Sequence, residues 1–179
     1  MKHISEIKLL IMDVDGTLTN GLITYDDRGG ESKSFHTADG LGIVMALYVG
    51  LSCAVVTGRA SEVVQRRMSE LGITDIVQDI SDKASAVKEL MAKYEVTPNQ
   101  TAFIGDDIND LPAFAQVGTK IAVADAASII RHAADIILTR PGGHGAVREA
   151  IEEILTSQGR LGDGMDMYLA RRTKRTSGQ

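Results

Sequence analysis

The stretch that decides the fold of this chain is Leu9-Leu10-Ile11-Met12-Asp13-Val14-Asp15-Gly16-Thr17. Its first four residues are all apolar, which is typical of a strand buried on both faces, as strands of a parallel sheet are. Two carboxylates, Asp13 and Asp15, follow at once. Ligands bind beyond the carboxyl ends of the strands in an open parallel sheet. The stretch therefore predicts a buried strand that ends in a functional site.

The same rhythm continues along the chain. Five more short apolar runs predict strands, at residues 52–56, 76–77, 101–104, 120–123 and 136–138. Amphipathic stretches between and after them predict helices, at residues 61–71, 83–94, 110–117 and 146–155. The first helix opens on Ser61, a preferred N-cap residue, and is closed by Gly72. Strands that alternate with helices form right-handed βαβ units, so we expect an α/β fold, a three-layer Rossmann-like parallel sheet flanked by helices.

One segment departs from this rhythm. Two short runs flank a Gly-containing turn, which predicts a protruding β-hairpin over about residues 22–36. A two-stranded ribbon is marginal in water, so the hairpin must lean on something, and a second subunit is one candidate. No linker interrupts the chain before about residue 158. We therefore expect a single domain over residues 1–158 and a C-terminal tail over residues 159–179.

Composition excludes several classes of protein. The chain has 179 residues, of which 44% are hydrophobic and 24% are charged, as in ordinary globular domains. No apolar run approaches the roughly 20 residues of a membrane span, and the N-terminus lacks the pattern of a signal peptide. A single cysteine, Cys53, excludes an intrachain disulfide. We therefore expect a cytoplasmic protein that has no membrane partner.

The charge is unevenly distributed along the chain. The net charge is −5, but the segment from Arg160 onward carries five basic and two acidic residues, so its balance is +3 and that of the body is −8. The acidic body argues against a nucleic-acid partner. The basic tail is either a solvated, frayed end or an arm that docks on an acidic neighbour.

Polar side chains converge on one edge of the predicted sheet. Besides Asp13 and Asp15, they belong to Thr57-Gly58-Arg59, to Lys83 and to Gly105-Asp106-Asp107-Ile108-Asn109-Asp110. Carboxylates crowded together repel one another, so such a cluster usually holds a cation. Oxygen ligands favour a hard ion such as Mg²⁺, and Mg²⁺ bound in this way favours a phosphate substrate.

This arrangement predicts a division of roles in the hydrolysis of a phosphate ester. Asp13 can attack phosphorus as a nucleophile, and Asp15 can deliver a proton to the leaving oxygen. Thr57 can donate to a phosphoryl oxygen, while Lys83 neutralises phosphoryl charge and holds Asp13 in place. Aspartates and glycines at strand ends also make ordinary turns and helix caps, but turns alone do not explain five such features at one edge.

In their order and spacing these residues resemble the four motifs of the haloacid dehalogenase-like phosphohydrolases. The resemblance implies that Asp13 is the phospho-aspartyl nucleophile and that Asp15 is the general acid and base. It also implies that Thr57 and Lys83 bind the phosphoryl group.

The same resemblance implies a Mg²⁺ site. Its ligands would be Asp13, the backbone carbonyl of Asp15, and Asp106. Asp107 and Asp110 would lie behind them as supporting or water-mediated groups.

The spacing of the motifs leaves no room for a cap domain. Only 43 residues separate Asp13 from Thr57, and only 25 separate Thr57 from Lys83. Four further stretches resemble the capless subfamily of 3-deoxy-D-manno-octulosonate 8-phosphate (KDO 8-phosphate) phosphatases. They are Ser34-Phe35-His36, Asp39-Gly40-Leu41-Gly42-Ile43, Ala122-Val123-Ala124-Asp125-Ala126 and Gly142-Gly143-His144-Gly145-Ala146-Val147-Arg148-Glu149. The subfamily implies a homotetramer assembled through the hairpins, in which each subunit helps to cover a neighbour's site.

This subfamily implies a sugar-acid substrate, KDO 8-phosphate, cleaved to KDO and phosphate in lipopolysaccharide synthesis. The sugar-acid carboxylate needs a cation, for which Arg59, beside Gly58, is the best-placed candidate, followed by Arg67 or Arg66. Ala38 stands where we expect a basic residue. Nonulosonate 9-phosphates of the KDN or sialic acid type, or another small phosphate, therefore stay open as substrates. A non-catalytic interaction domain is a remote alternative that the complete catalytic set opposes.

Overall fold

The structure, a computed structural model, describes residues 4–176. Its centre is a six-stranded sheet in the order β5-β4-β1-β6-β7-β8, in which every pair of neighbours is parallel. The strands are β1 (Leu9–Met12), β4 (Ser52–Val56), β5 (Asp75–Val77), β6 (Thr101–Gly105), β7 (Thr119–Ala122) and β8 (Ile136–Ile137). Each of the six predicted apolar runs thus forms a strand of one parallel sheet.

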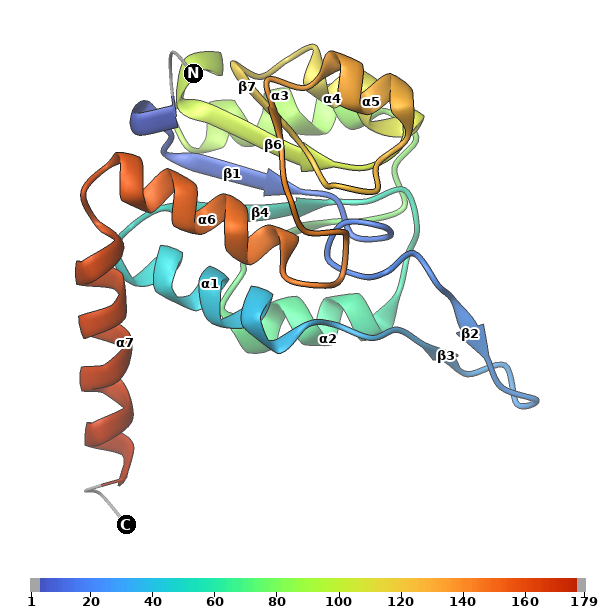
Figure 1. Ribbon diagram of the computed structural model, residues 1–179. Helices are drawn as coiled ribbons and strands as arrows, with labels where there is room; N and C mark the ends of the chain where they lie inside the picture. The colour runs from blue at the N-terminus through green and yellow to red at the C-terminus, as the bar shows by residue number, and fades with distance from the viewer. Residues whose placement is uncertain (1–3, 177–179) are drawn as a thin grey trace.

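Helices cover both faces of this sheet (Figure 1). One face carries α1 (Thr37–Tyr48), α2 (Glu62–Leu71) and α6 (Ala146–Ser157), and the other carries α3 (Lys83–Lys93), α4 (Leu111–Phe114) and α5 (Ser128–Ala133). Short 3₁₀ turns lie at Ile4–Glu6, Pro98–Gln100 and Ile108–Asp110. The predicted three-layer α/β fold is confirmed. The sequence pattern did not reveal α5, which is short and has no side-chain cap.

Local signals in the sequence have the expected effect on the helices that bear site residues. Ser61 caps α2 by accepting a hydrogen bond from the Val64 N–H at 3.5 Å, and Gly72 ends the helix with a φ of 89°. Asp82 caps α3 by accepting from the N–H groups of Ala84 and Ser85. The cap makes Lys83 the first residue of α3, and so anchors the base of its side chain at a helix end.

A buried carboxylate joins α1 to α6. Asp39, in the first turn of α1, accepts hydrogen bonds from the backbone N–H of Gly145 at 3.3 Å and of Arg148 at 2.7 Å. Burial raises the pKa of Asp39, and these two hydrogen bonds oppose that rise. The carboxylate thus caps the first turn of a helix more than 100 residues away along the chain.

The predicted hairpin protrudes from the carboxyl end of the sheet (Figure 1). It consists of β2 (Thr24–Tyr25) and β3 (Glu31–Ser32), which pair in antiparallel fashion, and Asp26 closes its turn by accepting from two backbone N–H groups at 2.8 Å. Leu22 and Tyr25 are 67% and 61% exposed. The hairpin therefore presents apolar surface to its surroundings.

The segment predicted as a tail forms a helix, α7 (Leu161–Thr176), which extends away from the body of the molecule (Figure 1). Gly164 packs on Met45 and Val49 of the body, and the Arg171 guanidinium lies 4.1 Å from the centroid of the Tyr48 ring. The docking of this segment on a neighbouring site stays a prediction. Within residues 4–176 no helix is both long and apolar enough to cross a bilayer.

Candidate active site

The order of the strands brings the predicted site residues to one edge. β1 lies between β4 and β6, with Met12 in register with Val55 on one side and with Ile104 on the other. The residues that follow these three strands are Asp13, Thr57 and Asp106. They emerge at the same edge because the three strands are parallel and end almost level.

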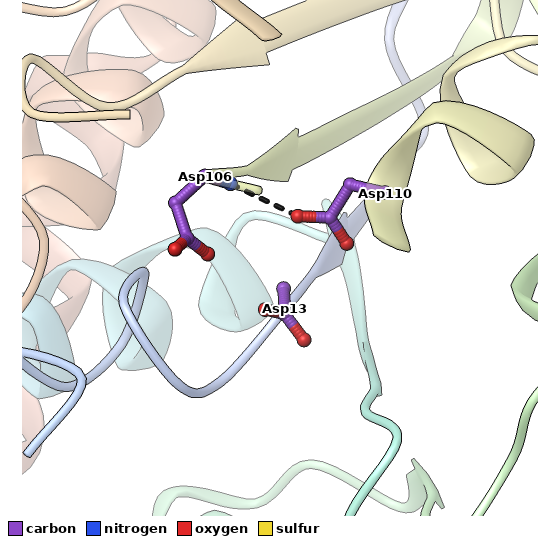
Figure 2. Close-up of side chains that lie close together, drawn as sticks. All are labelled: Asp13, Asp106 and Asp110. Atoms are coloured by element: carbon purple, nitrogen blue, oxygen red, sulfur yellow. Dashed lines mark hydrogen bonds between the residues drawn. The ribbon is translucent and has the colours of Figure 1, made fainter. Parts of the chain in front are cut away.

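Three carboxylates meet there. One oxygen from each of Asp13, Asp106 and Asp110 lies within 4.8 Å of the other two (Figure 2). Asp13 and Asp110 are 3% and 0% exposed. Asp110 is further fixed because its Oδ2 accepts from the backbone N–H of Asp106 at 2.9 Å. Gly16 allows the close approach of Asp106, since a Cβ at Gly16 would lie 2.0 Å from Asp106 Oδ2.

Lys83 reaches this cluster from the start of α3. Its Nζ donates to Asp13 Oδ1 at 2.7 Å and to Asp110 Oδ1 at 2.6 Å, and the residue is only 2% exposed. Burial disfavours its ammonium form, but the charges of Asp13 and Asp110 outweigh burial and raise the pKa of Lys83. Lys83 is therefore a fixed positive charge in contact with the predicted nucleophile.

One lysine does not balance three carboxylates. Burial, together with repulsion from Asp110, raises the pKa of Asp13 to about 6 despite its contact with Lys83. Burial and the charges of Asp13 and Asp110 raise the pKa of Asp106 to about 8. Carboxylates that resist ionisation in this way gain from a bound cation. Because all the donors are oxygens, the set fits a hard divalent ion such as Mg²⁺.

The two supporting aspartates have different positions. Asp110 lies inside the cluster, and the family resemblance implies a supporting or water-mediated role for it. Asp107 is exposed, and its Oδ1 accepts from the Ile108 N–H at 2.7 Å, so it caps the turn that follows β6. The exact division of metal ligands among these aspartates stays a prediction.

The side chain of Asp15 lies outside the three-carboxylate cluster and pairs with the hairpin. Lys33 Nζ donates to Asp15 Oδ1, and the side chain of Lys33 is fully buried while that of Asp15 is 21% exposed. Lys33 was not among the site residues predicted from the sequence. A signal was present, because Glu31, Lys33 and Phe35 alternate with the exposed Ser32 and Ser34 in the period of two that marks one face of a strand.

Thr57 and Arg59 follow β4, as predicted. Thr57 is 3% exposed, and its backbone N–H donates to Val77 O at 2.9 Å, which holds the strand end. Beyond Gly58, Arg59 Nη2 donates to the Tyr25 hydroxyl at 2.8 Å and lies 3.8 Å from Glu31 Oε2. Arg59 therefore turns toward the hairpin beside the site.

The other predicted cations lie on α2. Arg67 contacts Glu70 at 3.6 Å. Its guanidinium lies over Gly40 of α1, since a Cβ at Gly40 would lie 2.5 Å from Arg67 Nη2. Arg66 pairs with Glu70 and is 83% exposed. Within residues 4–176 neither arginine has an ion pair with the carboxylate cluster. Their assignment to a substrate carboxylate stays a prediction.

Comparison with known proteins agrees with this geometry. Residues 56–151 match the family profile of the haloacid dehalogenase-like hydrolases. The chain is 46% identical, over 89% of its length and 88% of the relative's, to a 3-deoxy-D-manno-octulosonate 8-phosphate phosphatase of Haemophilus influenzae. It is 41% identical, over 90% of its length and 86% of the relative's, to one of Escherichia coli.

The chain is also similar to solved structures of phosphatases that contain a metal ion. A Moraxella catarrhalis 3-deoxy-D-manno-octulosonate 8-phosphate phosphatase, in complex with magnesium, phosphate and KDO, superposes with a TM-score of 0.89 at 40% identity, covering 93% of this chain and 96% of that one. A cobalt-bound phosphatase of the same type from Haemophilus influenzae gives a TM-score of 0.86 at 46% identity, covering 88% and 92%.

Proposed function

This chain belongs to the haloacid dehalogenase-like hydrolases and, within them, to the KDO 8-phosphate phosphatases, and from that membership we infer that it hydrolyses KDO 8-phosphate to KDO and inorganic phosphate. The observation that carries this conclusion is the buried carboxylate of Asp13, which Lys83 holds beside Asp106 at the carboxyl end of the sheet. The chain that carries this site shares 40–46% identity with such phosphatases over most of its length.

We propose that hydrolysis proceeds in two steps. A carboxylate oxygen of Asp13 attacks phosphorus, the ester P–O bond breaks, and the sugar oxygen leaves with a proton from Asp15. Asp15 then removes a proton from the water that attacks the aspartyl-phosphate, and this step frees phosphate and restores Asp13. The hydroxyl of Thr57 donates a hydrogen bond to a phosphoryl oxygen. Lys83 keeps the attacking carboxylate in place and offsets phosphoryl charge.

We propose that Mg²⁺ is the resident metal. Asp13, the backbone carbonyl of Asp15 and Asp106 would hold it, with Asp107 and Asp110 in support. The ion supplies charge neutralisation for the phosphoryl oxygens when it is bound. The crowding of oxygen donors around Asp106, and the raised pKa values of Asp13 and Asp106, support this assignment.

The carboxylate of the sugar acid needs a cation away from the metal. Arg59, beside Gly58 and next to the hairpin, is the best-placed group for this role, and Arg67 is the second candidate. The reduced cytoplasm is the compartment that we propose, because the chain has a single cysteine, Cys53, which is a free thiol.

Release of phosphate tests substrate and metal together. We expect kcat/KM to be highest for KDO 8-phosphate, lower for a nonulosonate 9-phosphate and lowest for p-nitrophenyl phosphate, and we expect EDTA to abolish all three activities. If kcat/KM is instead highest for the nonulosonate 9-phosphate, that ester is the substrate, and the proposed two-step hydrolysis still holds. Turnover that persists in EDTA would contradict a metal-dependent site. If none of the esters releases phosphate with Mg²⁺ present, the proposed function is wrong.

We propose that the hairpin at residues 22–36 assembles the chain into a homotetramer. Its strands of two residues each are too short to stand alone, and Leu22 and Tyr25 expose apolar surface on it. We expect light scattering to give about four times the chain mass of 19.2 kDa. Leu22→Asp should lower that mass. Ile129→Asp, at a 48% exposed position on α5, is the control and should keep it. A monomeric wild-type protein would disprove the assembly.

A further inference from the structure

The ammonium of Lys33 lies at the site edge, and the proposed mechanism gives it no role. It comes from the residue after β3, it donates to Asp15 Oδ1, and its side chain is fully buried. Among residues 4–171, whose side chains the structure describes, no other group donates a hydrogen bond to the Asp15 carboxylate. A long side chain with a charged head is seldom enclosed in this way unless it is paired, so Asp15 and Glu31 are what hold it there.

We propose that Lys33 is the positioning residue for Asp15, fixing the carboxyl group where it can protonate the leaving oxygen of the substrate. This inference rests on the proposed function, because it assigns Asp15 the role of general acid. Asp15 follows β1 in a turn that continues through Gly16, whose φ is 91°, so its side chain lies outside the regular sheet. A turn of this kind does not by itself hold a carboxyl group in one orientation. Lys33 supplies the missing constraint.

The hairpin in turn is anchored to the site by alternating charges. Glu31 lies 3.6 Å from Lys33 Nζ on one side and 3.8 Å from Arg59 Nη2 on the other. Arg59 also donates to the Tyr25 hydroxyl at 2.8 Å, and Tyr25 pairs with Glu31 across the hairpin. The position of Lys33 is therefore defined by both hairpin strands and by the loop after β4.

This chain of contacts connects the two ends of the substrate. Asp15 faces the leaving oxygen in the proposed mechanism, while Arg59 is the proposed partner of the sugar-acid carboxylate. Lys33 and Glu31 bridge the two groups through the hairpin. A role for Lys33 in binding the phosphoryl group directly is disfavoured, because its ammonium is already enclosed between two carboxylates.

The dependence of the rate on the leaving group distinguishes a positioning role from a purely structural one. Cleavage of an alkyl ester such as KDO 8-phosphate needs a proton on the leaving oxygen, whereas 2,4-dinitrophenolate leaves without one. The parameter to measure is kcat/KM, because it reports the steps up to cleavage of the ester bond. Lys33→Met should lower kcat/KM for KDO 8-phosphate by about 10²-fold or more, and for 2,4-dinitrophenyl phosphate by less than about threefold.

Further variants make the result decisive. Asp15→Asn should show the same leaving-group pattern, and adding Lys33→Met to it should cause no further loss, because Lys33 acts through Asp15. Lys33→Arg keeps the charge and should recover part of the alkyl-ester activity. Lys93→Met is the matched control, since Lys93 is also paired with an aspartate, Asp75, but at 60% exposure and on α3; it should leave both esters unaffected.

Three outcomes would overturn the inference. An equal loss on both esters would mean that Lys33 supports the fold or the phosphoryl site. Unchanged kinetics would mean that Lys33 has no role, and losses that add in the double variant would mean that it does not act through Asp15. Thermal melts of each variant separate misfolding from these results, and Lys33→Gln replaces Lys33→Met if the latter does not fold. Failure of the proposed function itself differs, because the wild-type protein would then cleave neither ester.

Discussion

Replacement of Asp13 by Asn should abolish phosphate release from KDO 8-phosphate, with a fall in kcat of about 10⁶-fold, as for removal of a catalytic nucleophile elsewhere. The amide has the shape of the carboxylate but is a far weaker nucleophile. Lys83 keeps its bond to Asp110 in this variant. Burial and repulsion from Asp110 disfavour the ionised form of Asp13 in the folded protein. Replacing this carboxylate by a neutral amide should therefore leave the melting temperature equal or higher.

A rapid acid quench during turnover would check the same step directly. The wild-type protein should carry acid-stable, base-labile phosphate on one aspartate, and Asp13→Asn should carry none. Asp163→Asn, at an exposed position on α7, is the control and should be labelled like the wild type. Turnover by Asp13→Asn at more than about one part in a thousand would contradict nucleophilic catalysis. It would favour direct attack of water on the ester.

Lys83→Met should lower both activity and stability. Its loss leaves Asp13 and Asp110 buried without the ammonium that bridges them at 2.7 and 2.6 Å. Breaking a buried ion pair by removing one partner typically costs about 3–5 kcal/mol of unfolding free energy. The loss of a charge that stabilises the phosphoryl group should lower kcat/KM by about 10²–10³-fold. Urea unfolding in EDTA measures the first effect, free of any bound metal.

A second substitution separates the two effects. Asp110→Asn in the Lys83→Met background removes the unpaired charge and should recover part of the lost stability, whereas the activity should stay low. Lys120→Met is the control for a partly exposed pair, since Lys120 lies 3.7 Å from Asp135 and the two side chains are 31% and 45% exposed. That change should cost at most about 1 kcal/mol. If the double variant is no more stable than Lys83→Met, repulsion between the buried carboxylates is not the cause of the loss.

Much of this architecture could be predicted because the signals are local. An apolar run such as 9–12 becomes a buried strand wherever it lies in a parallel sheet, and the residue after it then falls at the ligand-binding edge. Ser61 and Gly72 ended α2 where they were expected to, since a cap needs only backbone groups within a few residues. The meeting of Asp13, Asp106 and Lys83 followed from these elements alone.

The tertiary structure decided which charged side chains pair. Nothing near Lys33 in sequence shows that the hairpin folds back far enough for it to reach Asp15, 18 residues earlier. On sequence grounds Arg59 was the better-placed cation for a substrate and Arg67 the next, yet Arg59 turns to Tyr25 and Arg67 lies over Gly40. The helix α7 contains Gly162 and Gly164, which disfavour a helix, and its contacts with Met45 and Tyr48 outweigh that preference.

The sequence by itself determined the strands and most of the helices of the sheet, the edge at which the site lies, and the catalytic residues proposed there. Each of these depends on hydrophobic period, on caps, or on position at the end of a strand. Only the tertiary structure decided the partners of Asp15, Arg59 and the final helix. Those contacts join segments far apart in the chain, and long side chains choose among charges by proximity, which the residue types alone do not specify.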